Sequence, residues 1–133
     1  MNSYTAANVA QVNLLAAWIG LFLAFGSGLL LGLGFHHENW LGGYGSFQRR
    51  LYRLGHISFF GLAAVNFMFF VTARFGGLHG SATGIASAAL LLGALTMPAS
   101  CFLMAHFPRL RVLFAVPVIS LICGAVLTMK GLL

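Results

Sequence analysis

Most of the chemically versatile side chains lie in one stretch, residues 35–56, with the sequence FHHENWLGGYGSFQRRLYRLGH. This stretch holds three of the five histidines, three of the seven basic residues and the sole acidic residue, Glu38. The sequence on either side is almost entirely apolar. Imidazole and guanidinium groups ligate metals, pair with anions or transfer protons, so we expect the chemistry of this protein to lie in or beside this stretch.

The composition places this stretch in a membrane protein. Of the 133 residues, 60% are hydrophobic and 6% are charged, whereas a soluble domain carries about 25% charged residues. Since so few charges cannot cover the surface of a soluble protein, we expect lipid to surround most of the chain. The net charge of +6 comes from basic residues scattered over loops, which argues against nucleic-acid binding and favours contacts with phospholipids.

Four apolar segments predict an all-α membrane protein: a four-transmembrane-helix up-and-down bundle with short loops, forming a single domain over residues 1–133. We expect spans at about residues 12–34, 51–75, 82–105 and 110–129, each long enough to cross roughly 30 Å of hydrocarbon. Residues 1–11 are expected to form a short tail. Because the loops are short, consecutive helices should be antiparallel neighbours.

Glycines and polar residues near or within the spans predict specific contacts. Gly28 and Gly32 form a GxxxG pattern and Gly84 lies in a second stripe of small residues, so we expect close helix approach at both. Asn66 lies near the middle of its span and should find a partner on a neighbouring helix. Ser46 is placed to act as the N-cap of the second helix.

The basic residues in the loops predict the orientation in the membrane. The first and third loops carry five of them, Arg49, Arg50, Arg53, Arg109 and Arg111, and the opposite side carries two, Arg74 and Lys130. Basic residues accumulate in cytoplasmic loops, so this imbalance places both termini outside. We expect a bacterial inner membrane, in which the termini would be periplasmic.

The alternation of the spans brings four histidines to one membrane face. The candidate cofactor-binding residues at this face are His56, His106, His36, His37, Arg53, Arg49 and Arg109. His56 stands out because it lies about one turn inside its span, where an ionisable side chain suggests a functional role.

Two redox cofactors would suit these residues. Haem b takes axial histidines from facing helices, such as His56 with His106, His36 or His37, and arginine partners for its propionates. A quinone carbonyl needs a donor such as His56 or Tyr52 beside an apolar slot. The haem interpretation is weakened by the position of the other histidines at helix ends, where a macrocycle would be poorly shielded.

A metal ion is a third ligand to consider. His56 and His106 are the candidate ligands, and copper(I) would add the soft ligands Met97, Cys101 and Met104, which share one helix face. A methionine and cysteine stripe at this spacing more often serves helix packing.

The sequence contains no paired carboxylates, no serine–histidine–aspartate arrangement and no phosphate loop, so it does not favour an enzyme or a soluble small-molecule substrate. We therefore expect a small integral membrane subunit of a larger respiratory or photosynthetic electron-transfer complex, carrying or contacting a haem b or a quinone through His56. Its partners would be other membrane-protein subunits and phospholipids. The alternatives are a structural, lipid-binding accessory subunit without a cofactor and a copper-binding membrane protein.

Overall fold

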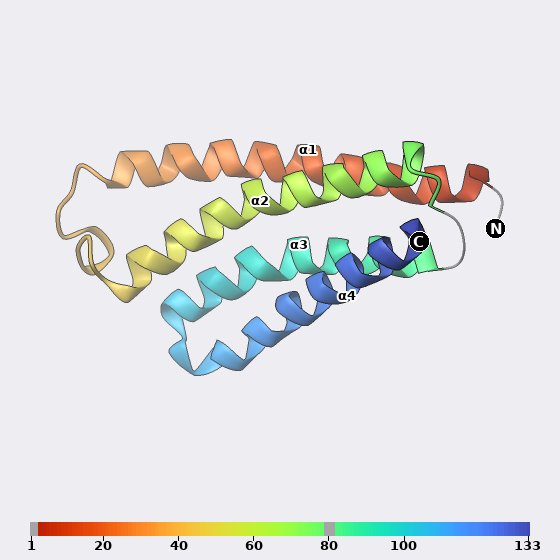
Figure 1. The fold of residues 1–133 in the computed structure, drawn as a ribbon. Helices are drawn as coiled ribbons and strands as arrows, with labels where there is room; N and C mark the ends of the chain where they lie inside the picture. The colour runs from red at the N-terminus through yellow and green to blue at the C-terminus, as the bar shows by residue number, and fades with distance from the viewer. Residues whose placement is uncertain (1–2, 79–81) are drawn as a thin grey trace.

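Four long helices account for most of the described residues (Figure 1). The computed structural model describes residues 3–78 and 82–133, with side chains from residue 8 onward. The helices are α1 (Ser3–Gly34), α2 (Phe47–Phe75), α3 (Ala82–His106) and α4 (Ala115–Leu132), and two 3-10 helices, η1 (Trp40–Gly42) and η2 (Pro108–Phe114), precede α2 and α4. No strand occurs in the described ranges. The expected all-α four-helix class is confirmed.

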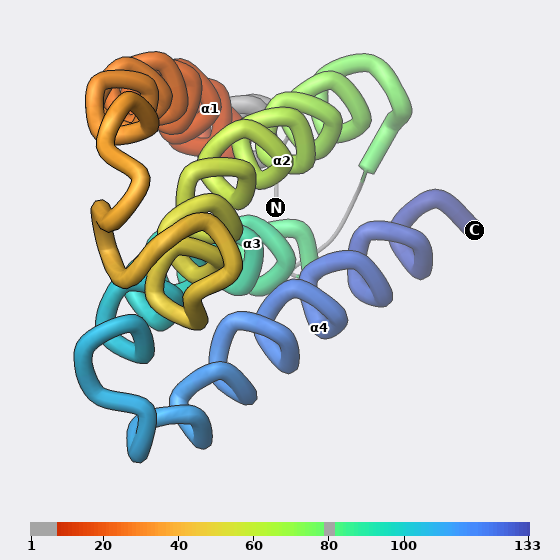
Figure 2. The backbone as a smooth tube through the Cα atoms, turned by 90° about the vertical axis from the view of Figure 1, so that its left-hand side faces the viewer, coloured from red at the N-terminus to blue at the C-terminus, as the bar shows by residue number. Residues whose placement is uncertain are grey.

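The helices pack mainly in chain order, with α1 on α2, α2 on α3 and α3 on α4. A smaller contact joins α1 to α3, and α2 and α3 therefore form the centre of the bundle. Figure 2 shows α1 and α4 on opposite outer sides of this central pair. The start of α1 and the end of α4 lie at one end of the bundle, and the α1–α2 and α3–α4 connections lie at the other (Figure 1).

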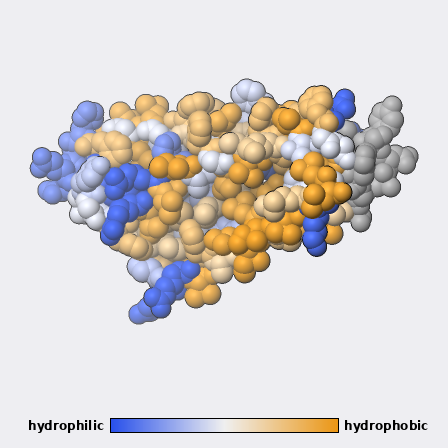
Figure 3. All heavy atoms as spheres, in the orientation of Figure 1, coloured by the Kyte–Doolittle hydropathy of each residue, from blue (hydrophilic) through white to orange (hydrophobic). Residues whose placement is uncertain are grey.

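The outer surface is that of an integral membrane protein. Segments long and apolar enough to cross a membrane are Asn8–Gly34, Phe47–Phe75, Ala82–His106 and Pro108–Leu132. Large apolar side chains project outward, among them Phe22 of α1 at 76% exposure and Ile119 of α4 at 66%. Figure 3 shows apolar residues across the middle of one face and hydrophilic residues towards the ends. Lipid is the solvent that suits such a surface.

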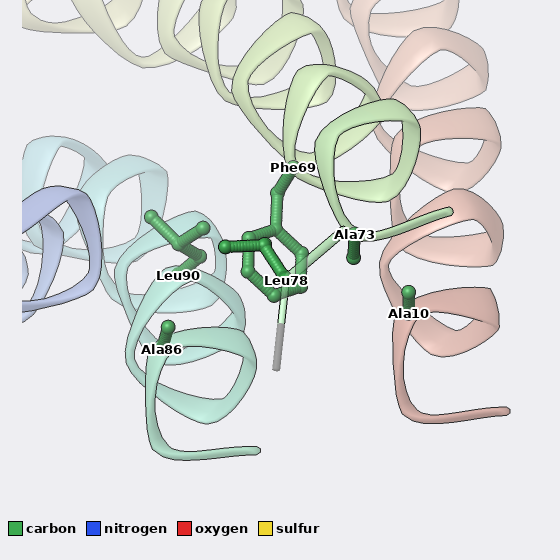
Figure 4. Close-up of a cluster of buried hydrophobic side chains, with 6 residues drawn as sticks. All are labelled: Ala10, Phe69, Ala73, Leu78, Ala86 and Leu90. Atoms are coloured by element: carbon green, nitrogen blue, oxygen red, sulfur yellow. The ribbon is translucent and has the colours of Figure 1, made fainter. Parts of the chain in front are cut away.

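The first helix begins earlier than expected. Residues 3–11 are helical, so the prediction of a tail is wrong for these residues. Ala10 is completely buried, and it packs in an apolar cluster formed by Ala10, Phe69, Ala73, Leu78, Ala86 and Leu90 (Figure 4). Contacts with α2 and α3 therefore hold the start of α1 in the helical conformation that alanine favours.

The fourth helix begins later than expected, at Ala115 rather than at about residue 110. Residues 108–114 form η2 instead. An α-helix running through this segment would direct the carbonyl of Leu113 at the ring of Pro117, which has no N–H to meet it. In the observed structure Pro117 lies in the first turn of α4, where a missing donor is tolerated.

A buried polar network joins α1, α2 and α3. The Asn13 side-chain amide donates to Asn66 Oδ1 at 2.8 Å, and the Ser87 hydroxyl donates to Asn13 Oδ1 at 2.5 Å. The Asn66 amide also donates to the carbonyl of Leu62 at 2.9 Å, and both asparagines are completely buried. The prediction that Asn66 has a partner on a neighbouring helix is confirmed.

The expected glycine stripes are only partly packed. A Cβ built on Gly28 would lie 2.9 Å from His56 Cε1, so Gly28 is a close contact, as expected. A Cβ on Gly32 or Gly84 would meet no described atom within 4 Å. The predictions of close approach at Gly32 and Gly84 are therefore wrong, because helical spacing defines a face but does not say whether that face meets a helix or lipid.

Other glycines form the contact between α3 and α4. A Cβ on Gly93 would lie 2.5 Å from Leu121, and a Cβ on Gly124 would lie 2.7 Å from Leu90. Each glycine thus receives a leucine side chain from the opposite helix, and both glycines are buried.

Replacing Asn66 with alanine should destabilise the bundle by about 1–2 kcal/mol, because the buried amide of Asn13 loses its acceptor. Unfolding in mixed detergent micelles measures this change. The control is Thr128→Val, whose hydroxyl bonds only to the Gly124 carbonyl of its own helix at 2.7 Å. Equal stability of the two variants would contradict the role given to the network.

A leucine at Gly93 should prevent the close approach of α4, whereas a leucine at Gly84 on the same helix should be tolerated. Gly93 faces Leu121, and Gly84 faces open space in the described structure. We expect the Gly93→Leu protein to unfold at lower denaturant concentration, and the Gly84→Leu protein to match the wild type. The reverse order would show that the α3–α4 contact is misassigned.

Candidate functional site

The loop between α1 and α2 folds into a fixed turn at the end of the bundle. Leu41, Gly42 and Gly43 have positive φ angles of 54°, 79° and 91°. The Ser46 hydroxyl donates to the carbonyl of Leu41 and accepts from the backbone N–H of Arg49 at 3.1 Å. The prediction that Ser46 caps α2 is confirmed, and the cap ties the turn to the first residues of that helix.

This turn lays the Trp40 indole on the end of α1. A Cβ on Gly34 would lie 2.6 Å from the indole, so only glycine leaves room for the ring there. The ring also meets Phe35 and Tyr52 edge-on, with centroid distances of 6.3 and 6.4 Å. Trp40 therefore bridges the loop, α1 and α2.

Arg49 is buried in an aromatic box, although it was expected to face a cofactor. Its side chain is 3% exposed, and its guanidinium carbon lies 4.9 Å from the ring centre of Phe35, 5.7 Å from that of Trp40 and 5.3 Å from that of Tyr44. Its Nε is buried and has no hydrogen-bond partner. Arg53 lies beside the same box, 4.8 Å from the Tyr44 ring centre, and donates to the Tyr44 carbonyl at 3.4 Å.

His56 turns towards α1. Its Nδ1 lies 2.9 Å from the Ser27 hydroxyl, and its ring rests on Gly28. The Ser27 hydroxyl also donates to the Ala24 carbonyl at 3.2 Å. When the single hydroxyl proton is used in that bond, His56 donates from Nδ1, and its Nε2 keeps a free lone pair.

His106 makes a different contact, between α2 and α3. Its Nε2 lies 2.8 Å from the Tyr52 hydroxyl, and Tyr52 also packs against Phe102 with a centroid distance of 5.3 Å. His106 is exposed at the end of α3. His56 and His106 therefore belong to separate helix interfaces and do not face each other.

A cavity of about 160 Å³ lies between these two contacts. It is lined by Ser27, Leu30, Leu31, Trp40, Tyr52 and Phe102. Two hydroxyl-bearing residues, each hydrogen-bonded to one histidine, thus belong to the lining of an otherwise largely apolar space. Ser27 was missed by the sequence analysis, although a hydroxyl between two glycines in an apolar span is a signal that would have found it.

The remaining candidates do not join this cavity. His36, His37 and Arg109 are exposed on the connections. In the described part of the chain, no group of three or more histidine, cysteine or acidic side chains is placed to hold a metal ion. Cys101 is buried beside Gly55 and forms no disulfide. The four histidines thus lie at one end of the bundle, but they do not come together in a single metal or cofactor site.

Comparison with known proteins does not identify a family. No protein-family model, no curated protein and no solved structure matches this chain. The functional assignment therefore depends on the cavity and on the chemistry of the residues around it.

Proposed function

We propose that this protein is a small integral membrane subunit of a membrane-bound electron-transfer complex, and that the cavity beneath Trp40 receives the ring of a quinone. The observation that carries the proposal is that two hydroxyl-bearing residues, Ser27 and Tyr52, line an otherwise largely apolar cavity. A quinone ring needs an apolar slot and a donor for each carbonyl oxygen. In this proposal His56 and His106 donate to the two hydroxyls, and the Ser27 hydroxyl turns its single proton from the Ala24 carbonyl to the quinone.

The size of the cavity favours a quinone ring over a haem b. Sites for whole small molecules enclose about 300–1,000 Å³. A cavity of about 160 Å³ suits a single ring whose apolar tail continues between the helices into lipid. A haem held by both histidines is less well supported, because His56 contacts α1 whereas His106 contacts Tyr52 of α2.

The same contacts suggest a path for protons. Reduction of a quinone to a quinol takes up protons together with electrons. Tyr52 lines the cavity, and its hydroxyl is hydrogen-bonded to the exposed His106. An imidazole in contact with water can take up a proton at one ring nitrogen and release one from the other. Electrons would come from partner subunits, for which the exposed apolar faces of α1 and α4 offer contact surfaces.

Binding of a short-chain ubiquinone tests this function. The chain has two tryptophans, so in a Trp18→Phe background the tryptophan fluorescence comes from Trp40 alone. We expect saturable quenching of Trp40 fluorescence in lipid nanodiscs. Ser27→Ala should weaken the binding about five- to tenfold, because one donor to the ring is lost.

The matched control is Ser120→Ala, which removes a hydroxyl from α4, away from the cavity. This variant should bind as tightly as its background. Quenching that does not saturate, or equal affinities for the two serine variants, would overturn the quinone assignment.

We propose a bacterial inner membrane with both termini periplasmic, because arginines are in excess at the end of the bundle that carries the α1–α2 and α3–α4 connections. Labelling of single cysteines in a background without Cys101 and Cys123 tests this orientation. An impermeant maleimide should label Ser3→Cys from outside intact cells, whereas Asn39→Cys should react only after lysis. The opposite pattern would invert the topology.

A further inference from the structure

The aromatic box around Arg49, which we call the Arg49 box, is formed by the rings of Phe35, Trp40 and Tyr44. It has the features of an anion-binding site. Arg49 is 3% exposed, and its Nε has no hydrogen-bond partner. The only acidic residue of the chain, Glu38, is exposed on the loop, and the described residues form no ion pair. The positive charge of Arg49 is thus buried without a compensating negative charge from its own chain.

Aromatic rings compensate such a charge only in part. The faces of Phe35, Trp40 and Tyr44 attract the guanidinium, but they cannot take the place of oxygen acceptors for its N–H groups. A buried cation is costly unless it is paired and hydrogen-bonded. The box therefore lacks an anion that brings oxygen acceptors.

The position of the box indicates which anion that is. It lies at the end of the bundle that carries the α1–α2 connection, beside the half-buried Arg53 and next in sequence to the exposed Arg50. Trp40 and Tyr44 are the amphipathic aromatic residues that concentrate at headgroup depth. Phosphate groups are the abundant anions at this depth, and a guanidinium binds phosphate through paired N–H donors.

We propose that Arg49, assisted by Arg53, binds the phosphate of an anionic phospholipid headgroup. Tyr44 is 70% exposed and forms the outer wall of the box, so its ring can move aside to admit the headgroup. The bound lipid would fix the loop against the membrane surface. This site does not depend on the quinone proposal, because Trp40 is the only residue that it shares with the cavity.

Native mass spectrometry of the purified full-length protein tests the site. The protein is incubated in neutral detergent with equal amounts of phosphatidylglycerol and phosphatidylcholine. We expect the wild type to retain phosphatidylglycerol preferentially. Arg49→Gln should reduce this preference about tenfold, since a charged hydrogen-bond donor is lost.

Arg50→Gln is the matched control, because it removes the same charge from an exposed neighbouring position. It should keep the preference for phosphatidylglycerol to within about twofold, as surface charges contribute little. Arg49→Lys keeps the charge but loses the planar guanidinium with its paired N–H donors. Its preference for phosphatidylglycerol should therefore lie between those of the wild type and Arg49→Gln. If Arg49→Gln does not fold, Arg49→Lys alone must still bind more weakly than the wild type.

Three outcomes would overturn the proposal. The first is equal retention of the two lipids by the wild type, which would show that the box does not select an anionic headgroup, because phosphatidylcholine carries a phosphate without a net negative charge. The second is the same loss in Arg49→Gln and Arg50→Gln, which would indicate only a diffuse surface charge. The third is displacement of the lipid by millimolar inorganic phosphate, which would indicate a site for free phosphate.

Discussion

The structure depends on the satisfaction of buried amides where no water is available. In hydrocarbon, Asn13 and Asn66 each need a partner, and they find it in each other. This pairing fixes the antiparallel register of α1 and α2. At 1.5 Å per residue, about 21 Å from Asn13 along α1 and about 15 Å from Asn66 along α2, Ser27 meets His56 across the same helix pair. A slip of one turn would break both contacts, so the amide pair and the histidine contact reinforce each other.

The two ends of the bundle differ in how their interior is filled. At the end with the termini, the apolar cluster around Phe69 and Leu78 closes the space between α1, α2 and α3 (Figure 4). At the opposite end the helices are separated by a cavity and covered by the loop that carries Trp40. The apolar cluster lies next to the amide network and holds three helices together at one end, whereas the cavity with its two hydroxyl-bearing residues lies towards the other end.

The sequence predicts well what depends on composition or on neighbouring residues. Hydropathy reveals the four spans because lipid surrounds each helix, and the Ser46 cap is a local hydrogen bond. The direction in which each helix face points is harder to predict, since lipid and helix interior are equally apolar. Gly84 was for this reason expected at a helix contact that it does not make, and Asn13 was overlooked.

The difficulty of predicting which way a helix face points also explains why the histidine contacts of the candidate site could not be predicted. Topology brings the histidines to one end, but the rotation of each helix decides that His56 meets α1 and that His106 meets Tyr52. One side chain then links the two proposed functions. Trp40 lines the cavity proposed for the quinone ring and forms a wall of the Arg49 box. A lipid phosphate at Arg49 that steadies the indole would also set the shape of the cavity beneath it, so lipid composition and quinone affinity would be linked through this ring.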